Sequence, residues 1–311
     1  MFARILIDID VLAEDHPAID QGLDFAARSG SAVTLVDTLP DLPPAAIRVL
    51  GAAVEEEILE HRRQRLADIA GGRPASPPIE TRLLRGKPSV AIVQEVLRGG
   101  HDLVIRSHGR ERGETPPFGP VDLQLLRTCP CPVWLVARTA VAPPRRLLAA
   151  VDVSDPAPDA RALGQAIVEL AAAIRTVEDG ELTVLHAWQV FGQDLLSSHM
   201  SPEDLNEYVD AAKADATRMF DDFAGQLGAL RAAARFELAE GEPHRVIVDA
   251  VKGGRFDLVV IGTVARTGLT GFLLGNTAER VLRDLRGSVL AVKPAGFVSP
   301  ITLDARAASS R

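Results

Sequence analysis

The sequence has no excess of basic residues and no long apolar run. Its 34 lysines and arginines stand against 42 aspartates and glutamates, a net charge of −8, which argues against a nucleic-acid-binding surface. No apolar run approaches the roughly 18 residues that a membrane span requires, and residues 1–10 lack the apolar region of a signal peptide. We therefore expect a cytoplasmic protein that binds neither nucleic acid nor membrane.

Cysteine is scarce, and the two cysteines, Cys129 and Cys131, are separated by a single proline. On an extended chain we expect their side chains to point to opposite faces, which would make them poor disulfide partners. Without a second cysteine pair they are also a weak zinc signal, and none of the seven histidines forms a pair at helical ligand spacing. The sequence therefore predicts no metal site and is typical of a reducing compartment.

Catalytic signatures are missing as well. There is no Gly-x-Ser-x-Gly elbow, and Lys252 and Lys293 both lie outside any phosphate-loop motif. The sequence offers no dedicated general base and no carboxylate cluster for a catalytic metal, and Asp152 is the one acidic candidate. We therefore do not expect a dedicated enzyme.

What the sequence does contain is an internal repeat. Residues 83–102 and 238–257 share their apolar pattern, and Gly86, Pro88 and Asp102 recur at one constant spacing as Gly241, Pro243 and Asp257. Residues 4–10 and 146–152 also match, at a shorter spacing, so the second half carries a longer insertion. Apolar positions, glycine and proline that recur in one order indicate two copies of the same unit.

Each unit alternates short apolar strands with helical stretches. This alternation predicts right-handed crossovers and a mostly parallel sheet. The predicted strands are 5–9, 33–36, 79–84, 103–105 and 133–136 in the first half, and 147–151, 182–186, 235–239, 258–261 and 289–292 in the second. We expect domains at 1–139 and 145–295, followed by a tail at 296–311.

The clearest helix signal starts at Ser201, a capping serine followed by Pro202. Apolar residues then recur at spacings of three and four from Leu205 to Leu230, which predicts one continuous buried stripe. The last strands of the two halves, 133–136 and 289–292, would be exposed apolar edges if left unpaired. We expect them to pair with each other, which would make the chain an intramolecular pseudo-dimer.

A glycine-containing loop follows a strand in the second half. It begins at Gly262 and ends at Gly275, after which Asn276 and Thr277 open a helix. Glycine lets backbone amides approach phosphate oxygens, and the first amides of a helix suit an anion. Arg266 would add charge-assisted hydrogen bonds. The alternative is a plain strand-to-helix connection.

This loop resembles the nucleotide motif of the universal stress protein family: Gly, two residues, Gly, nine residues, Gly, then Ser or Thr. Positions 262, 265, 275 and 276 fit the spacing, with Ala265 in place of the second glycine and Asn276 in place of Ser or Thr. The resemblance covers roughly residues 1–295 and points to the tandem branch of the family. It implies two Rossmann-like, adenine nucleotide alpha hydrolase-like domains, each a five-stranded parallel sheet flanked by helices and related by a pseudo-two-fold axis.

The resemblance also implies a ligand and its site. The family leads us to expect ATP or a related nucleotide at the carboxyl ends of the strands, as in open α/β sheets generally, with or without magnesium. Asp152 would contact the nucleoside, and Ala150, Ala187 and Ile261 would line the adenine pocket. Capping of a turn with Ser154 and Asp155 is the alternative role for Asp152.

The first half has lost these features. We place Arg106 where the first glycine should be, and the preceding strand is one residue shorter than its counterpart. Pro120 removes an amide from the following helix, and Pro116 and Pro117 stiffen the loop. The leading hypothesis is a stress-response regulator or chaperone-like protein that binds nucleotide only in its second half. The alternatives are a nucleotide-free scaffold for another small or lipidic ligand, and a slow ATPase; further homodimerisation and the protein partners stay open.

Overall fold

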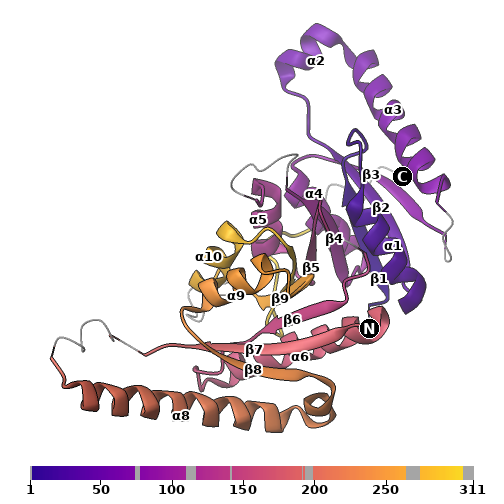
Figure 1. Ribbon diagram of the computed structural model, residues 1–311. Coiled ribbons are helices and arrows are strands. Elements are labelled where there is room, and N and C mark those ends of the chain that lie inside the picture. Colours follow the sequence, from indigo (N-terminus) through magenta and orange to yellow (C-terminus); the bar gives the residue numbers. More distant parts are fainter. Residues whose placement is uncertain are drawn as a thin grey trace.

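The computed structural model describes residues 2–73, 78–109, 117–140, 142–190, 192, 199–263 and 274–303. Within them, ten strands form one continuous sheet in the order β3-β2-β1-β4-β5-β10-β9-β6-β7-β8 (Figure 1). The first half contributes β1 (Arg4–Ile9), β2 (Ala32–Leu39), β3 (Glu80–Arg85), β4 (Leu103–His108) and β5 (Val133–Ala137). The second contributes β6 (Arg146–Ala150), β7 (Glu181–Trp188), β8 (Arg235–Glu240), β9 (Leu258–Gly262) and β10 (Ser288–Val292).

The two halves join through their last strands. β5 and β10 pair antiparallel, with Trp134 opposite Leu290, whereas the strand pairs inside each half are parallel. Ser288 strengthens this seam because its hydroxyl accepts the amide of Ala137 at 3.1 Å. All five residues of each seam strand are buried. The predicted fold of two five-stranded parallel units and their predicted internal pairing are both confirmed.

Helices cover both faces of the sheet. They are α1 (Pro17–Ser29), α2 (Pro44–Leu50), α3 (Ala52–Gly71), α4 (Pro88–Gly99), α5 (Pro120–Thr128), α6 (Pro158–Glu178), α8 (Pro202–Gln226), α9 (Pro243–Lys252) and α10 (Asn276–Asp284), with a 3-10 turn at Gly228–Ala233. One core cluster, built with α1, α3, α6 and α8, runs through both halves on one face. The other face packs against α4, α5, α9 and α10. None of the described helices is long and apolar enough to cross a membrane.

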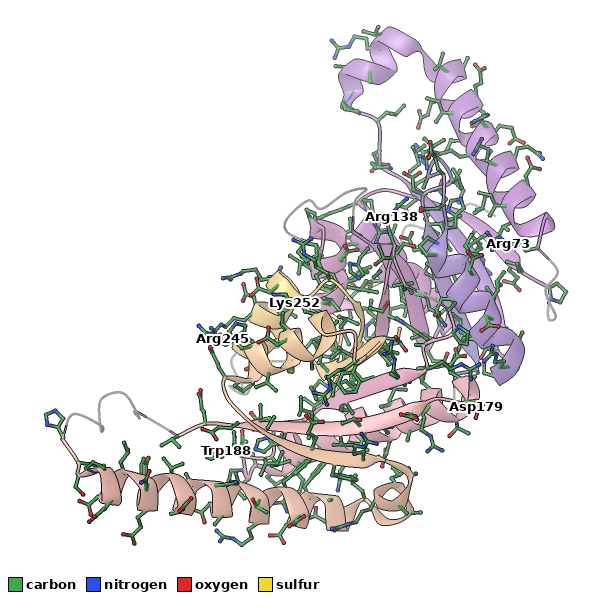
Figure 2. The ribbon with its side chains drawn as sticks, viewed as in Figure 1. Arg73, Arg138, Asp179, Trp188, Arg245 and Lys252 are labelled. Atoms are coloured by element: carbon green, nitrogen blue, oxygen red, sulfur yellow. The ribbon has the colours of Figure 1, made fainter. Side chains whose placement is uncertain are left out.

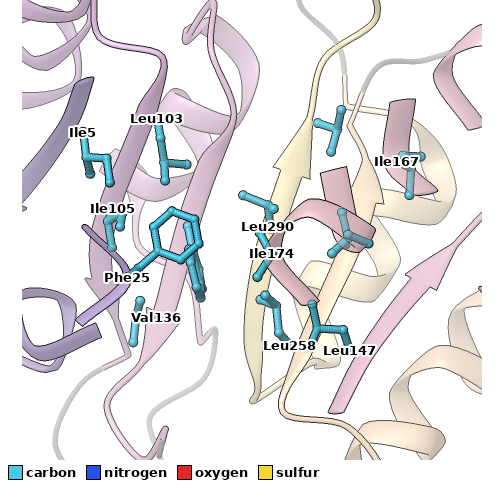
Figure 3. Close-up of a cluster of buried hydrophobic side chains, with 14 of the residues drawn as sticks. Ile5, Phe25, Leu103, Ile105, Val136, Leu147, Ile167, Ile174, Leu258 and Leu290 are labelled. Carbon is cyan, nitrogen blue, oxygen red and sulfur yellow. The ribbon is translucent and has the colours of Figure 1, made fainter. Parts of the chain in front are cut away.

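The core of the first face is shared across the seam. Phe25 of α1 packs edge-on against Trp134 of β5, with ring centroids 5.8 Å apart. Figure 3 shows Phe25 among Ile5, Leu103 and Ile105, facing Leu290 and Ile174 of the second half. At the ends of α1 and α6, the side chain of Arg28 donates to the fully buried Glu178 at 3.0 Å. The two units therefore pack as one body rather than as separate domains on a linker.

The repeated residues have the same structural roles in both halves. Asp102 accepts the amides of Ala3 and Arg4, at 2.6 and 2.9 Å. In the second half, the Asp257 carboxylate accepts the amides of Arg145 and Arg146, at 3.0 and 2.9 Å. Each aspartate thus ties the start of its own strand to the start of the first strand of its unit, which fixes the register of the two strands.

The repeated glycines and prolines also follow from backbone geometry. Gly86 and Gly241 have φ values of 104° and 134°, a region that disfavours residues with a Cβ. Pro88 and Pro243 each begin a helix, where the missing amide proton costs nothing. The repeat found in the sequence is therefore a repeat of turn geometry and strand register, in addition to apolar pattern.

Helix α8 confirms its predicted start and corrects its predicted stripe. The Ser201 hydroxyl accepts the amide of Asp204 at 3.1 Å, as expected of a capping serine. Phe220 and Phe223 are buried, but Tyr208 and its neighbours in the first turns are only partly covered. The first turns extend past the end of β7, where Trp188 is the last residue of the strand (Figures 1 and 2). The prediction of one continuous buried stripe was therefore wrong, because the helix is longer than the strands beneath it.

The start of the predicted tail crosses to the first half. The side chain of Gln94 on α4 donates to the carbonyl of Thr302 at 3.1 Å, and Ile301 packs against the second core cluster. Asp304 to Arg311 lie outside the described residues.

Candidate functional site

The predicted base-binding residues lie at the carboxyl ends of neighbouring strands. Ala150, the last residue of β6, is paired in register with Ile261 of β9 on one side and Leu185 of β7 on the other. Ala187 lies two residues further along β7. Because these strands are parallel, the three predicted residues meet at one edge of the sheet. Ile261 is buried, whereas Ala150 and Ala187 remain partly exposed.

Asp152 lies two residues past β6 and is exposed. Its Oδ1 accepts the amide of Ser154 at 3.0 Å and the Ser154 hydroxyl at 2.6 Å, so the turn-capping role is present. Asp152 also lines a cavity of about 180 Å³ between the loop after β6 and helix α8, together with Arg161 and Phe223. Sites for drug-sized ligands usually measure about 300–1,000 Å³. The cavity is smaller than such a site and has room for only part of a nucleotide. The described residues that we predict to bind the phosphates do not line it.

Gly262 ends β9 beneath helix α6. A Cβ at this position would come within 2.9 Å of Leu163 and 3.4 Å of Ile167. The absence of a side chain therefore lets α6 approach the end of β9 closely, a packing role that the sequence did not indicate. Close approach of the backbone to a phosphate would need the same lack of a side chain. Gly262 can therefore serve both the packing against α6 and the predicted phosphate contact.

Gly275 connects the end of β9 to helix α10. Its amide donates to the carbonyl of Thr263 at 3.2 Å, and its carbonyl accepts the amide of Glu279 at 2.8 Å. The next two residues, Asn276 and Thr277, form the first turn of α10, and both are exposed. Amides of a first helical turn have no partner within the helix. The hydrogen bond from Gly275 to Thr263 places the start of α10 next to the end of β9, beside the strand edge formed by Ala150 and Ile261. Ala265 and Arg266 lie outside the described residues.

The register of the first half corrects one interpretation of the sequence. Arg106 of β4 pairs with Asp8 of β1, just as Ile261 pairs with Ala150. Arg106 is therefore the counterpart of Ile261, and Ser107 takes the place of the first glycine. β4 is not shorter than β9: it runs from Leu103 to His108, against Leu258 to Gly262. The error came from counting back from a loop that differs between the halves, whereas the aspartates at the strand starts set the register.

Arg106 joins two carboxylates at the strand edge of the first half. Its guanidinium donates through Nε to Asp122 of α5 at 2.8 Å, and through Nη1 to Asp8. Asp8 is only 2% exposed, and burial raises its pKa to about 6 against the opposing effect of Arg106. Asp122 also accepts the amide of Gly119 at 2.7 Å. The protein's own side chains thus occupy the space above β1 and β4 and take up the amide just before α5.

A second arginine extends the same arrangement. Arg62 of α3 donates to Asp37 of β2 at 2.5 Å and lies 3.4 Å from Asp10. Asp10 is the counterpart of Asp152, and it accepts the amide of Leu12 in the same kind of turn, at 3.0 Å. In the first half, therefore, the carboxylate that would face a ligand already faces an arginine. Neither the Arg62–Asp37 pair nor the Arg106–Asp8 pair could be predicted from the sequence, because the partners lie far apart along the chain.

His108 has a structural role at the edge of the first half. Its ring stacks on Phe118 at 4.2 Å between centroids. Its two nitrogens lie 3.4 and 3.1 Å from the carbonyls of Pro117 and Gly287. His108 therefore ties the edge of the first half to the second half. Among the described residues, no group of three or more His, Cys, Asp or Glu side chains is arranged to hold a metal ion.

Comparison with known proteins places this architecture. A model described as the universal stress protein family matches residues 1–137 and again 144–293. The chain belongs to this family. It is 29% identical to Universal stress protein E of Escherichia coli K12 over 98% of both chains. It is 30% identical to a Universal stress protein E homolog of Haemophilus influenzae, over 71% of this chain and 72% of that one.

Solved structures show the same tandem architecture over nearly the whole chain. A protein of unknown function from Pseudomonas aeruginosa PAO1 has a TM-score of 0.68 and 26% identity, and the match covers 94% of this chain and 93% of that one. A universal stress protein from Archaeoglobus fulgidus has a TM-score of 0.61 over 93% and 98% of the two chains, at 19% identity, and supports the fold. This chain is thus a tandem universal stress protein.

Proposed function

We propose that the second domain binds ATP or a related adenine nucleotide at the carboxyl edge of β6, β7 and β9. The bound nucleotide biases the conformation or the partner choice of a cytoplasmic stress-response protein. The proposed domains are 1–139 and 145–295.

One observation carries the proposal: equivalent strand positions differ in chemistry between the two halves. Ala150 and Ile261 give the second half a small apolar platform, where Asp8 and Arg106 form a buried ion pair in the first. A flat apolar surface suits an aromatic base, which gains from burial of its faces. A buried ion pair would have to be broken to admit a base, which is costly.

The surrounding residues suit the rest of a nucleotide. Asp152 lies two residues after Ala150 and lines a cavity on the α6 and α8 side of the sheet, where its carboxylate would accept hydrogen bonds from ribose hydroxyls or from the base. The exposed first turn of α10, with Gly275, Asn276 and Thr277, lies at the same edge and offers amides to phosphate oxygens. Gly262, Ala265 and Arg266 complete the proposed phosphate site. Ala150, Ala187 and Ile261 would surround the adenine.

Calorimetric titration of the full-length protein with ATP, ADP and AMP, with and without magnesium, tests this function. We expect binding of at least one adenine nucleotide, tighter as phosphates are added, because the start of α10 would contact them. A similar affinity for AMP and ATP would argue against the assigned phosphate residues. No binding by any of the three would overturn the proposal and favour a scaffold that takes another small or lipidic ligand. Slow hydrolysis, measured as phosphate release under the same conditions, would add the third function.

A further inference from the structure

Cys129 and Cys131 lie together between α5 and β5. Their sulfurs are 3.5 Å apart, and the two residues are 0% and 8% exposed. The expectation that they point to opposite faces was wrong, because residues two apart on an extended chain share a face. A disulfide needs a sulfur separation of about 2.05 Å. The two thiols are therefore close enough to bond after a small movement.

A buried lysine from the other half lies beside this pair. Lys293 follows β10 and is 9% exposed; its ammonium donates to the carbonyl of Leu126 and lies 4.7 Å from the ring centroid of Phe297. Burial lowers the pKa of Lys293 to about 8, and the charge of Cys129 opposes this effect. The pKa of the Cys129 thiol is lowered mainly by its hydrogen bond with Cys131, against the opposing effect of burial, and the charge of Lys293 lowers it further.

The local charge balance points to a thiolate. A buried ammonium is costly without an anion beside it. In the part of the chain that the structure describes, the salt bridges include none between a carboxylate and Lys293, and Cys129 is the acidic group that raises its pKa. A Cys129 thiolate would therefore act as the counter-charge of Lys293 across the β5–β10 seam. A thiolate, rather than a thiol, is the nucleophile that oxidants attack.

We propose that Cys129 and Cys131 are a peroxide-sensitive dithiol whose oxidation to a disulfide removes the counter-charge of Lys293 at the seam. The Cys129 thiolate attacks hydrogen peroxide, the O–O bond breaks, and the departing hydroxide takes a proton to become water. This leaves a sulfenic acid on Cys129. The Cys131 sulfur then attacks that sulfur, loses its proton, and displaces the hydroxyl group as a second water. Two thiols and one peroxide thus give one disulfide and two waters.

The consequence is a link between redox state and the stability of the seam. Lys293 belongs to the second domain and the two cysteines to the first. After oxidation, the ammonium stays buried without its anion. We therefore expect the oxidised protein to unfold at a lower temperature than the reduced protein. If position 293 carries no charge, this difference should disappear.

The first test follows the chemistry on the full-length protein. We expect hydrogen peroxide to remove two hydrogens from the peptide that contains both cysteines, as seen by mass spectrometry, and a thiol reductant to restore them. Lys293→Met should slow the reaction about tenfold, because the Cys129 thiolate would lose the ammonium that favours it. Lys252→Met is the matched control, since Lys252 ends α9 in an exposed position (Figure 2), and its rate should equal that of the wild type.

The second test follows the seam. Oxidation should lower the melting temperature of the wild type and leave that of Lys293→Met unchanged. Cys131→Ser cannot form the disulfide, so peroxide should not produce the mass loss in that variant. Failure to form the disulfide in the wild type would overturn the proposal, as would equal oxidation rates in the two lysine variants. Equal melting shifts in the wild type and Lys293→Met would refute the link to the seam.

Discussion

The two halves of the sheet share a fold and differ at one strand edge. In the first half, Asp8, Arg106 and Asp122 form a buried ionic group, and the amide of Gly119 is bound to one of its carboxylates. In the second half, the positions of the two strand residues are held by Ala150 and Ile261. A duplicated unit can therefore keep its core and its seam while one copy fills its ligand edge with its own charges.

The comparison extends to the helices that follow each loop. Pro120 begins α5 without an amide proton, and Asp122 accepts the one amide donor just before the helix. Asn276 begins α10 with its amide intact, and the helix has no side-chain cap. An anion at the start of α10 would meet backbone amides that have no partner within the helix, whereas an anion at the start of α5 would be repelled by the Asp122 carboxylate. The strand edges of the two halves therefore differ in charge as well as in the room they leave for a ligand.

The largest expected effect comes from breaking the ionic group. Arg106→Met would leave Asp8 and Asp122 buried near each other without a cation, which costs about 3–5 kcal/mol. Chemical denaturation measures this loss of unfolding free energy. A triple variant, Asp8→Ala with Arg106→Ile and Asp122→Ala, copies the second half and should recover most of it. A loss below about 1 kcal/mol in Arg106→Met would show that the ionic group does not hold this edge together.

A pH series should expose the same group. The pKa of Asp8 is raised from 3.8 to about 6, so its protonated form is favoured in the folded state. Its stabilising contribution is therefore complete below pH 3.8 and is lost as the pH rises through 6. The difference in unfolding free energy between the wild type and Asp8→Asn should change by about 3 kcal/mol across this window. A constant difference would mean that Asp8 titrates normally.

Glycines at matching helix starts offer a test of the ligand edge. Gly275→Val places a branched side chain where the phosphates would meet α10, and we expect nucleotide affinity to fall about a hundredfold, equivalent to roughly 2.8 kcal/mol. Gly119→Val makes the same change beside α5 and should leave the affinity nearly unchanged. Calorimetry on both folded variants gives the comparison. Equal losses would show that the two edges had been wrongly distinguished.

The smallest expected effect concerns Ala265, where the family motif has glycine. Ala265→Gly should relieve any strain and make room beside the phosphates, so affinity for ATP should rise by up to about tenfold. Glycine also loosens the unbound loop, which works against this gain. Tighter binding would indicate a nucleotide site that has drifted from the family pattern. Unchanged or absent binding in a folded variant would favour the scaffold.

Particular residues show how far the sequence could lead. Gly86, Pro88 and Asp102 recur because turn geometry and strand register demand them, so the tandem fold was readable from their spacing. The apolar last strands likewise predicted the seam. Arg106 was misplaced by one residue because its position was counted back from the loop, which differs between the halves, and not forward from Asp102 and Asp257. The packing role of Gly262 against Leu163 was missed because Leu163 lies on α6, far from Gly262 along the chain.

The most direct test of the central claim is the number of nucleotides bound per chain. Titration of the full-length wild type with ATP should give a stoichiometry near one. Gly275→Val should weaken this binding about a hundredfold, while Gly119→Val should still bind one nucleotide with nearly unchanged affinity. A stoichiometry near two in the wild type would show that nucleotide also binds in the first half, despite its ionic group. Loss of the single site in Gly119→Val alone would place it in the wrong half, and either result would contradict the account.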